Sequence, residues 1–227
     1  MASSRRIASP LASREFVDHL LADLRSSGFS LAGWARLWER SLERSEEQAG
    51  RHPRAARENH LIHVLAAPFL PGRWTIASWW MTWSHLGLLG EDDRQLGWPN
   101  RLSLVRGVLP ALFPGAGPVP ALLALGTDFA DGRVARAEGG ATAFGAFADP
   151  LADSIFWTWF ALREEPNRWL KGLSVALWLG PAAGVTAAYF LRAEAIGIPD
   201  QVSLRPLSAA LQIFLTARSV RRRWRAP

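Results

Sequence analysis

Four aspartates lie at helical spacing in the most apolar part of the chain, within the stretch TDFADGRVARAEGGATAFGAFADPLAD from Thr127 to Asp153. Asp128 and Asp131 are three residues apart, and Asp149 and Asp153 are four apart, so each pair lies on one face of a helix. An unpaired carboxylate in an apolar environment costs several kcal/mol or is forced to protonate. The spacing therefore predicts one pocket in which all four carboxylates meet and are compensated.

Divalent cations are the compensation that this set of side chains favours. The stretch holds no His, and the whole chain has no Cys, which excludes disulfides and thiolate metal sites. Carboxylates alone are hard oxygen ligands that suit Mg²⁺, Mn²⁺ or Ca²⁺, and two such ions are a common arrangement for phosphate transfer. The alternative, pairing of the aspartates with Arg133 and Arg136, would leave two or three carboxylates uncompensated.

Small and basic residues surround the aspartates. Gly132, Ala135 and Gly145 are small enough to let a substrate or a neighbouring helix approach the backbone closely. Arg136 lies one turn after Gly132, where it can hold a phosphate by charge-assisted hydrogen bonds. The surroundings are therefore compatible with a phosphate-bearing substrate.

Closely spaced helices are expected to position these residues. The apolar segments run over 103–113, 120–136 and about 143–162, with Thr142 as the N-cap of the last, and a further apolar helix covers about 207–217. The short Gly-containing connection between the two aspartate segments predicts that they are antiparallel neighbours. All four carboxylates would then face one pocket.

The composition favours an integral membrane protein over a soluble helical bundle. Residues 172–191 form a run of 20 without a charged side chain, enough to cross a hydrocarbon core of about 30 Å. Many of the twelve Trp lie near the ends of apolar runs, among them Trp98, Trp157, Trp159 and Trp169, as is typical of a membrane interface. The net charge of +6 is concentrated in terminal arginines, which suits anionic lipid headgroups better than nucleic acid.

The predicted fold is all-α: a polytopic membrane helix bundle of five to six transmembrane helices with an N-terminal amphipathic helical extension. The expected organisation is an extension over 1–60, an apolar membrane-associated segment over 61–97, a membrane core over 98–220 and a basic tail over 221–227. A break at Gly180–Pro181 would divide the long apolar run into two helices and give six crossings. The basic tail would then lie on the same side as the active site.

The N-terminal region reads as two amphipathic helices within 13–47, interrupted at 26–30 and followed by a polar linker over 49–59. Their apolar stripes predict packing on the protein's own core, with the membrane surface as the alternative partner. No function for residues 1–97 follows from the sequence.

The stretch from Asp128 to Asp153 resembles the signature of the CDP-alcohol phosphatidyltransferase family, D-x-x-D-G-x-x-A-R-x8-G-x3-D-x3-D, at every fixed position. The preceding WPNRLSLVRGVL is similar to the first helix of phosphatidylglycerophosphate-synthase-type members, whose pattern is P-N-x-L-[ST]-x-x-R. The resemblance covers residues 98–165 well and the residues before them not at all.

This resemblance implies a phospholipid-synthesising membrane enzyme of the cytoplasmic membrane whose active site faces the cytoplasm. CDP-diacylglycerol would bind with its pyrophosphate on two divalent cations, Mg²⁺ or Mn²⁺. An alcohol would attack the lipid-side phosphorus and release CMP. The resemblance is also compatible with assembly as a homodimer. By motif position the metal ligands would be Asp128, Asp131, Asp149 and Asp153, with Asp153 also the general base, and the CDP-lipid contacts would be Gly132, Ala135, Arg136, Thr142 and Gly145.

The acceptor alcohol is the open point of the resemblance. Members that use glycerol phosphate usually carry Lys directly after the last aspartate, where this chain has Ser154. Glycerol 3-phosphate is the best expectation, with inositol phosphate or another alcohol as alternatives, and Arg106, Arg133 and Arg192 as candidates to bind the acceptor's phosphate. A catalytically silent membrane scaffold is the competing class of function, and the presence of all four aspartates argues against it.

Overall fold

The computed structural model describes residues 10–66, 72–90, 95–113, 115, 117–137, 142–192 and 205–225. Within these ranges the chain forms nine α-helices, one short 3₁₀ helix and no strand, so the all-α prediction is confirmed. The elements are α1 (Pro10–Ser26), α2 (Leu31–Arg51), α3 (Pro53–Ala66), α4 (Arg73–Ser84), η1 (Leu86–Leu88), α5 (Gly97–Leu112), α6 (Pro118–Ala137), α7 (Ala143–Glu164), α8 (Arg168–Arg192) and α9 (Arg205–Arg225).

The two predicted N-terminal helices are present as α1 and α2, and Ser30 caps α2 by accepting a hydrogen bond from the Gly33 amide at 3.2 Å. The polar linker predicted over 49–59 is wrong, because α2 runs on to Arg51 and α3 starts at Pro53. Proline suits the first turn of a helix, and the Ala, Arg and Glu residues that follow are good helix formers. The polar residues over 49–59 therefore belong to helices with a solvent-exposed side and not to a linker.

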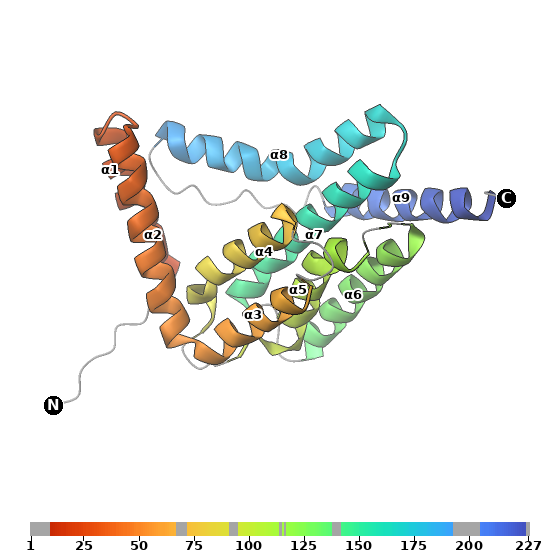
Figure 1. The fold of residues 1–227 in the computed structure, drawn as a ribbon, viewed down its shortest axis with the longest axis horizontal. Helices are drawn as coiled ribbons and strands as arrows, with labels where there is room; N and C mark the ends of the chain where they lie inside the picture. The colour runs from red at the N-terminus through yellow and green to blue at the C-terminus, as the bar shows by residue number, and fades with distance from the viewer. Residues whose placement is uncertain are drawn as a thin grey trace.

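Helix α5 lies at the centre of the arrangement in Figure 1, where it packs against α3, α4, α6 and α7. The two aspartate helices, α6 and α7, pack chiefly on α5, and their side chains also meet in the larger core, where Ala121 of α6 joins Phe156 of α7. The direct contact expected between them is therefore minor beside the contact that each makes with α5. The reason is that α5 offers buried apolar residues to both, with Leu104 packed in the cluster around α7 and Leu109 in the cluster that includes α6.

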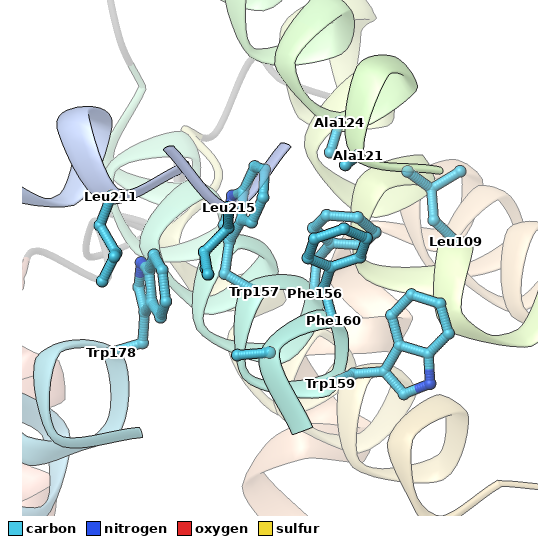
Figure 2. Packing of buried hydrophobic residues seen from close by; sticks show 11 residues of the cluster. Leu109, Ala121, Ala124, Phe156, Trp157, Trp159, Phe160, Trp178, Leu211 and Leu215 are labelled. Carbon is cyan, nitrogen blue, oxygen red and sulfur yellow. The ribbon is translucent and has the colours of Figure 1, made fainter. Parts of the chain in front are cut away.

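The larger hydrophobic core surrounds the second half of α7 (Figure 2). Phe156 and Phe160 are stacked at 5.9 Å and face the residues from α5 and α6, while Trp157 is stacked at 6.0 Å on Trp178 of α8. Leu211 and Leu215 of α9 complete the cluster: Leu109, Ala121, Ala124, Phe156, Trp157, Trp159, Phe160, Ala161, Trp178, Leu211 and Leu215. This core holds the end of α7 that lies beyond the aspartates.

A second core joins the N-terminal half of the chain to the aspartate helices. Ala55 of α3 and Leu86 of η1 pack with Leu104 of α5 and with Phe144 and Ala148 of α7. Phe147 of α7 is also stacked on His85, with ring centroids 3.8 Å apart. The residues that precede the recognised pattern therefore form the packing surface behind the first turns of α7.

The prediction that the N-terminal helices pack on the protein's own core is confirmed in part: α2 packs against α3, α4 and η1, whereas α1 packs mainly on α2. Leu20, Leu21 and Leu24 of α1 are buried. On α2, Leu31 and Trp38 remain exposed. In Figure 1 this pair of helices stands at one edge of the molecule, opposite the end of α9.

Helix α8 contains the long apolar run. Among the described residues it is the one helix long and apolar enough to cross a membrane, judged by length and composition. It continues without interruption through Pro181, so the predicted break at Gly180–Pro181 is wrong. A proline in a helix removes one hydrogen bond and bends the axis, which a long apolar helix can accommodate.

The four Trp residues that the sequence places near the ends of apolar runs divide into two groups. Trp98 and Trp169 are exposed, as expected of interfacial residues, but Trp157 and Trp159 are buried in the larger core. Sequence position near the end of an apolar run therefore did not distinguish a core Trp from a surface Trp. The basic segment that begins at Arg221 continues α9 as helix through Arg225.

Candidate active site

The structure brings the four aspartates together on the guanidinium of Arg106, which comes from α5. Arg106 Nη1 lies 2.7 Å from Asp128 Oδ1 and 3.2 Å from Asp153 Oδ1. Its Nη2 lies 2.8 Å from Asp131 Oδ2 and also donates to Asp149 Oδ1. The convergence that the spacing predicts is thus achieved around a side chain of the helix that lies between α6 and α7.

Close packing of α5 against its neighbours places Arg106 at this point. The next residue, Gly107, faces α4 and α7: a Cβ there would lie 3.1 Å from Ser78 Oγ and 3.7 Å from Ala152 Cβ. A larger side chain would push α5 away from both helices. The small residues Gly107 and Ala152 therefore set the depth at which Arg106 enters the aspartate cluster.

The cluster has an excess of negative charge. Four carboxylates face one guanidinium, and Arg106 is fully buried while the side chains of Asp128 and Asp149 are 45% and 42% exposed. One acceptor, Asp153 Oδ1, and one donor, Arg106 Nε, are buried without a hydrogen-bond partner among the described residues. The arrangement is therefore open to further positive charge from the side of Asp128 and Asp149.

The carboxylates also fit a divalent cation by their chemistry and spacing. One oxygen each from Asp128, Asp131 and Asp149 lie within 4.8 Å of one another. Oxygen-only ligands of this kind match Mg²⁺, Mn²⁺ and Ca²⁺. These residues are able to hold a metal ion, and Asp153 borders them through the same guanidinium.

Two polar neighbours of the aspartates were missed from the sequence. Ser103 Oγ donates to Asp131 Oδ2 at 3.3 Å and lies 3.5 Å from Asp149 Oδ1, while Gln212 Nε2 of α9 donates to Asp153 Oδ2 at 3.3 Å. Ser103 stands three residues before Arg106, at the [ST] position of the recognised pattern, so the pattern contained a signal for it. No spacing points to Gln212, which is 59 residues from Asp153.

The start of α7 forms a second part of the site. Thr142 is the N-cap, as predicted, and its Oγ1 accepts a hydrogen bond from the Gly145 amide at 3.0 Å. Asn100 of α5 donates to the same hydroxyl at 3.3 Å. A Cβ on Gly145 would lie 2.7 Å from Asn100 Oδ1, so only glycine admits this side chain. The close approach to the backbone that was expected at Gly145 is thus made by the side chain of Asn100.

The remaining predicted contacts lie on α6. Gly132 follows Asp131 directly, on the same helix as the first aspartate pair. Ala135 and Arg136 are in the last turn of α6, and their side chains lie outside the described part of the structure.

The candidate acceptor cations are placed differently from one another. Arg106 lies among the aspartates, whereas the guanidinium of Arg133 lies 5.4 Å from the ring of Phe129 and Arg192 is exposed at the end of α8. Ser154 Oγ is directed to backbone carbonyls, 2.7 Å from that of Pro150 and 3.1 Å from that of Trp178 on α8. The position after the last aspartate therefore faces α8.

An apolar groove runs between α6 and α9 close to the aspartates. Its volume is about 710 Å³, and Leu125, which lines it, is one helical turn before Asp128. The lining residues are Leu122, Leu125, Ile213, Thr216, Ala217, Val220, Arg221, Trp224 and Arg225.

The fold and site define an all-α protein whose central helices carry an acidic centre suited to cations. The family model for CDP-alcohol phosphatidyltransferase matches residues 99–220, and the chain belongs to that family. Among curated proteins and among solved structures, no match is found.

The family defines the chemistry in general terms. It transfers a phosphatidyl group from a CDP-alcohol to an alcohol in phospholipid biosynthesis, uses divalent metal ions and is typically bound to membranes. The matched residues include Arg106, all four aspartates and Gln212, and they begin after α3 and α4.

Proposed function

We propose that this protein is an integral membrane enzyme that moves the phosphatidyl group of CDP-diacylglycerol to an alcohol, with release of CMP. The observation that carries the proposal is the convergence of Asp128, Asp131, Asp149 and Asp153 on one buried guanidinium with negative charge in excess. A scaffold has no need of this excess of carboxylates, because carboxylates that share one cation repel one another until further positive charge binds.

The four aspartates would hold two divalent cations, Mg²⁺ or Mn²⁺. When bound, such ions neutralise a pyrophosphate and stabilise the charge that develops during phosphoryl transfer. In this chain Ser103 donates to Asp131 and orients it, and Arg106 supplies the positive charge that the carboxylates share. The opening beside Asp128 and Asp149 is the side from which the pyrophosphate would approach.

Asp153 is the proposed general base. An alcohol is a poor nucleophile, and a positioned carboxylate that removes its proton contributes roughly 10²- to 10⁴-fold to the rate. Gln212 donates to Asp153 Oδ2, which leaves Oδ1 without a hydrogen-bond donor. Oδ1, which forms no hydrogen bond and lies 3.2 Å from Arg106 Nη1, is the oxygen that would accept the proton.

The donor would occupy the start of α7 and the groove beside α6. Thr142 and Gly145, with Gly132, Ala135 and Arg136 of α6, are the proposed contacts of the CDP part. The apolar groove lined by Leu122, Leu125 and Ile213 would receive an acyl chain. A polar head at the aspartates and an apolar tail in the groove together match a CDP-linked lipid.

Glycerol 3-phosphate is the proposed acceptor, with inositol phosphate as the alternative. The phosphate of either would need a cation, and Ser154 offers none. Of Arg106, Arg133 and Arg192, Arg106 is next to Asp153 and is the first candidate. The sequence of α5, which is similar to the first helix of phosphatidylglycerophosphate-synthase-type members, supports glycerol 3-phosphate as the acceptor.

We place the protein in the cytoplasmic membrane with the site facing the cytoplasm. The family is typically membrane-bound, and α8 is long and apolar enough to span. The proposed organisation keeps several crossings within residues 98–220, with α8 crossing as a single helix. The preceding 1–60 and 61–97 would be associated with this core, and assembly as a homodimer is compatible with it.

The proposal is tested on membranes that contain the protein. They are incubated with labelled CDP-diacylglycerol, Mg²⁺ or Mn²⁺ and a panel of alcohols, and CMP release is measured. Asp153→Asn should lower the rate at least 100-fold, the lower range for loss of a general base. The control is Asp23→Asn, because Asp23 forms an exposed ion pair with Arg40 on the N-terminal helices. Absence of CMP release with every acceptor, or full activity in Asp153→Asn, would reject the proposal.

A further inference from the structure

Glu58 of α3 lies outside the family-matched segment, yet it binds the start of the helix that carries Arg106. Its Oε2 accepts hydrogen bonds from the Leu96 amide and from Arg101 Nε, both at 3.1 Å, and its Oε1 accepts from Arg101 Nη2 at 2.8 Å. One carboxylate thus fixes a backbone amide and a side chain on either side of the first turn of α5.

The first turn of α5 depends on an unusual backbone conformation. Gly97 has a φ of +75°, a left-handed value that glycine adopts without strain. Leu96, just before it, has its side chain buried in the second core. Glu58 therefore holds the chain at the point where it turns into the helix.

Leu96 and Asn100 transmit this position to the donor end of the site. The Leu96 amide is bound by Glu58, and the Leu96 carbonyl accepts a hydrogen bond from Asn100 Nδ2 at 2.5 Å. The same Nδ2 donates to Thr142 Oγ1, which caps α7 at the Gly145 amide. A continuous series of hydrogen bonds thus leads from α3 to the N-terminus of α7.

Packing restricts how Asn100 can respond if this series is broken. Its side chain is buried and fits against Gly145 in a space that a single Cβ would fill. A shift of the α5 first turn would therefore carry Asn100 against the α7 backbone or away from Thr142. Either movement disturbs the N-cap on which the CDP part is proposed to rest.

We propose that Glu58 is a positioning residue for the donor: from the N-terminal region it holds the first turn of α5, so that Asn100 keeps Thr142 and the N-terminus of α7 in place for the CDP part. The inference rests on the proposed function, in which Thr142 and Gly145 contact CDP. It gives residues that precede the family domain a part in substrate binding.

The Glu58–Arg101 ion pair contributes little to stability, so a kinetic effect of a Glu58 variant can be distinguished from unfolding. The side chains of Glu58 and Arg101 are 24% and 26% exposed, and partly exposed pairs of this kind stabilise a fold only weakly. Glu58→Gln keeps the size of the side chain, but it turns one of the two acceptor oxygens into an NH2 group and removes the charge, so it weakens the hydrogen bonds to both the Leu96 amide and Arg101. The variant is therefore expected to fold.

Steady-state kinetics with CDP-diacylglycerol as the varied substrate give the first measurement. We expect Glu58→Gln to raise the KM for the donor roughly tenfold, as for loss of a charged hydrogen bond, with kcat within roughly twofold of the parent. The matched control is Glu47→Gln, which removes the exposed pair of Glu47 with Arg51 on α2 and should change neither constant. A fall in kcat with unchanged donor KM would overturn the proposal.

Hydrogen exchange of the purified protein gives a second measurement that does not depend on activity. In Glu58→Gln the amides of Gly145 and Ala146, which bond Thr142, should exchange faster, together with those at 96–101, and Glu47→Gln should alter neither segment. Faster exchange at 96–101 alone would show that Glu58 acts locally and would overturn the inference. If the parent protein releases no CMP with any acceptor, the proposed function fails, and the exchange of the Gly145 and Ala146 amides alone decides the role of Glu58.

Discussion

Arg106 is the residue on which the electrostatics of the site depend. It is fully buried, and it pairs with four carboxylates that come from two other helices. Removal of one partner from a buried ion cluster is costly, because it leaves uncompensated charge behind. Arg106 therefore determines how strongly the aspartates repel one another before any cation binds.

Arg106→Gln should destabilise the protein most when divalent ions are removed. We expect a loss of about 3 to 5 kcal/mol in EDTA, as for buried ion pairs broken on one side, and a smaller loss with Mg²⁺ present. Thermal unfolding of detergent-solubilised protein with EDTA and with Mg²⁺ measures the difference. Arg133→Gln, at an exposed position, serves as the control and should change stability by under about 0.5 kcal/mol. Equal stability of parent and Arg106→Gln in EDTA would show that the cluster is not strained by its charge.

Gln212 should affect the chemical step through Asp153. Gln212→Leu removes the donor to Asp153 Oδ2 and leaves that oxygen without its partner. We expect kcat to fall roughly tenfold, because a mispositioned base loses part of its contribution, with little change in donor KM. Ser208→Ala, one turn earlier along α9, removes a hydroxyl that bonds within its own helix, to the Arg205 carbonyl, and is the control. Similar kinetic losses in both variants would indicate a general effect of α9.

Among the elements, α9 is tied to the end of α7 by a buried acid. Glu165 Oε1 and Oε2 each accept a hydrogen bond from Arg218 at 3.0 Å, and Arg222 Nη1 lies 3.2 Å from Oε2. Burial alone would raise the pKa of Glu165, but the hydrogen bonds from Arg218, the Asn167 amide and Arg222 hold this pKa below its usual range. This connection keeps α9, and with it Gln212, against α7.

The connection should weaken in acid. Because the pKa of Glu165 is lowered on folding from the ordinary value of 4.5, its stabilisation is complete above that pH and is lost as the pH falls through the folded-state pKa. Glu165→Gln should therefore cost about 2 kcal/mol at pH 7 and progressively less below about pH 4.5. Unfolding of both proteins across this range measures the difference, with Glu47→Gln as an exposed control. A difference that stays constant down to pH 3 would contradict the role of the charge.

For the whole molecule, the family domain and the N-terminal region share one core. Ala55 and Leu86 pack with Leu104, Phe144 and Ala148, so residues before 99 cover apolar surface of the matched segment. Because of this shared core, the N-terminal region and the matched segment form one folded unit.

Removal of residues 1–66 should therefore prevent stable folding. The truncation exposes the apolar faces of α5 and α7 and removes Glu58, and we expect aggregation in size-exclusion chromatography after detergent extraction. Removal of residues 1–29 takes away α1 alone and should leave a monodisperse protein with most of its activity. A fragment starting at residue 67 that is monodisperse and fully active would show that the matched segment folds by itself.

Local pattern was sufficient where the signal is contained in one helix. The all-α class, the Thr142 cap and the shared faces of Asp128 with Asp131 and Asp149 with Asp153 follow from spacing, because a helix repeats every 3.6 residues. Prediction failed where packing decides the outcome. Polar residues over 49–59 suggested a linker, Pro181 suggested a helix break, and Trp157 suggested a membrane interface, because none of these signals includes the neighbours that the residue has in the fold.

The sequence by itself determined the kind of site: the carboxylates without His or Cys favour hard cations, and the resemblance of the same stretch to a family signature indicated the transfer reaction. Only the tertiary structure decided what compensates them within the chain, because α5 lies between the aspartate helices and its depth is set by Gly107 and Ala152. The tertiary structure also decided that Gln212 binds Asp153, which is 59 residues away, and that Glu58 binds the Leu96 amide, which is 38 residues away. Contacts over such distances depend on how helices pack, and no local periodicity encodes them.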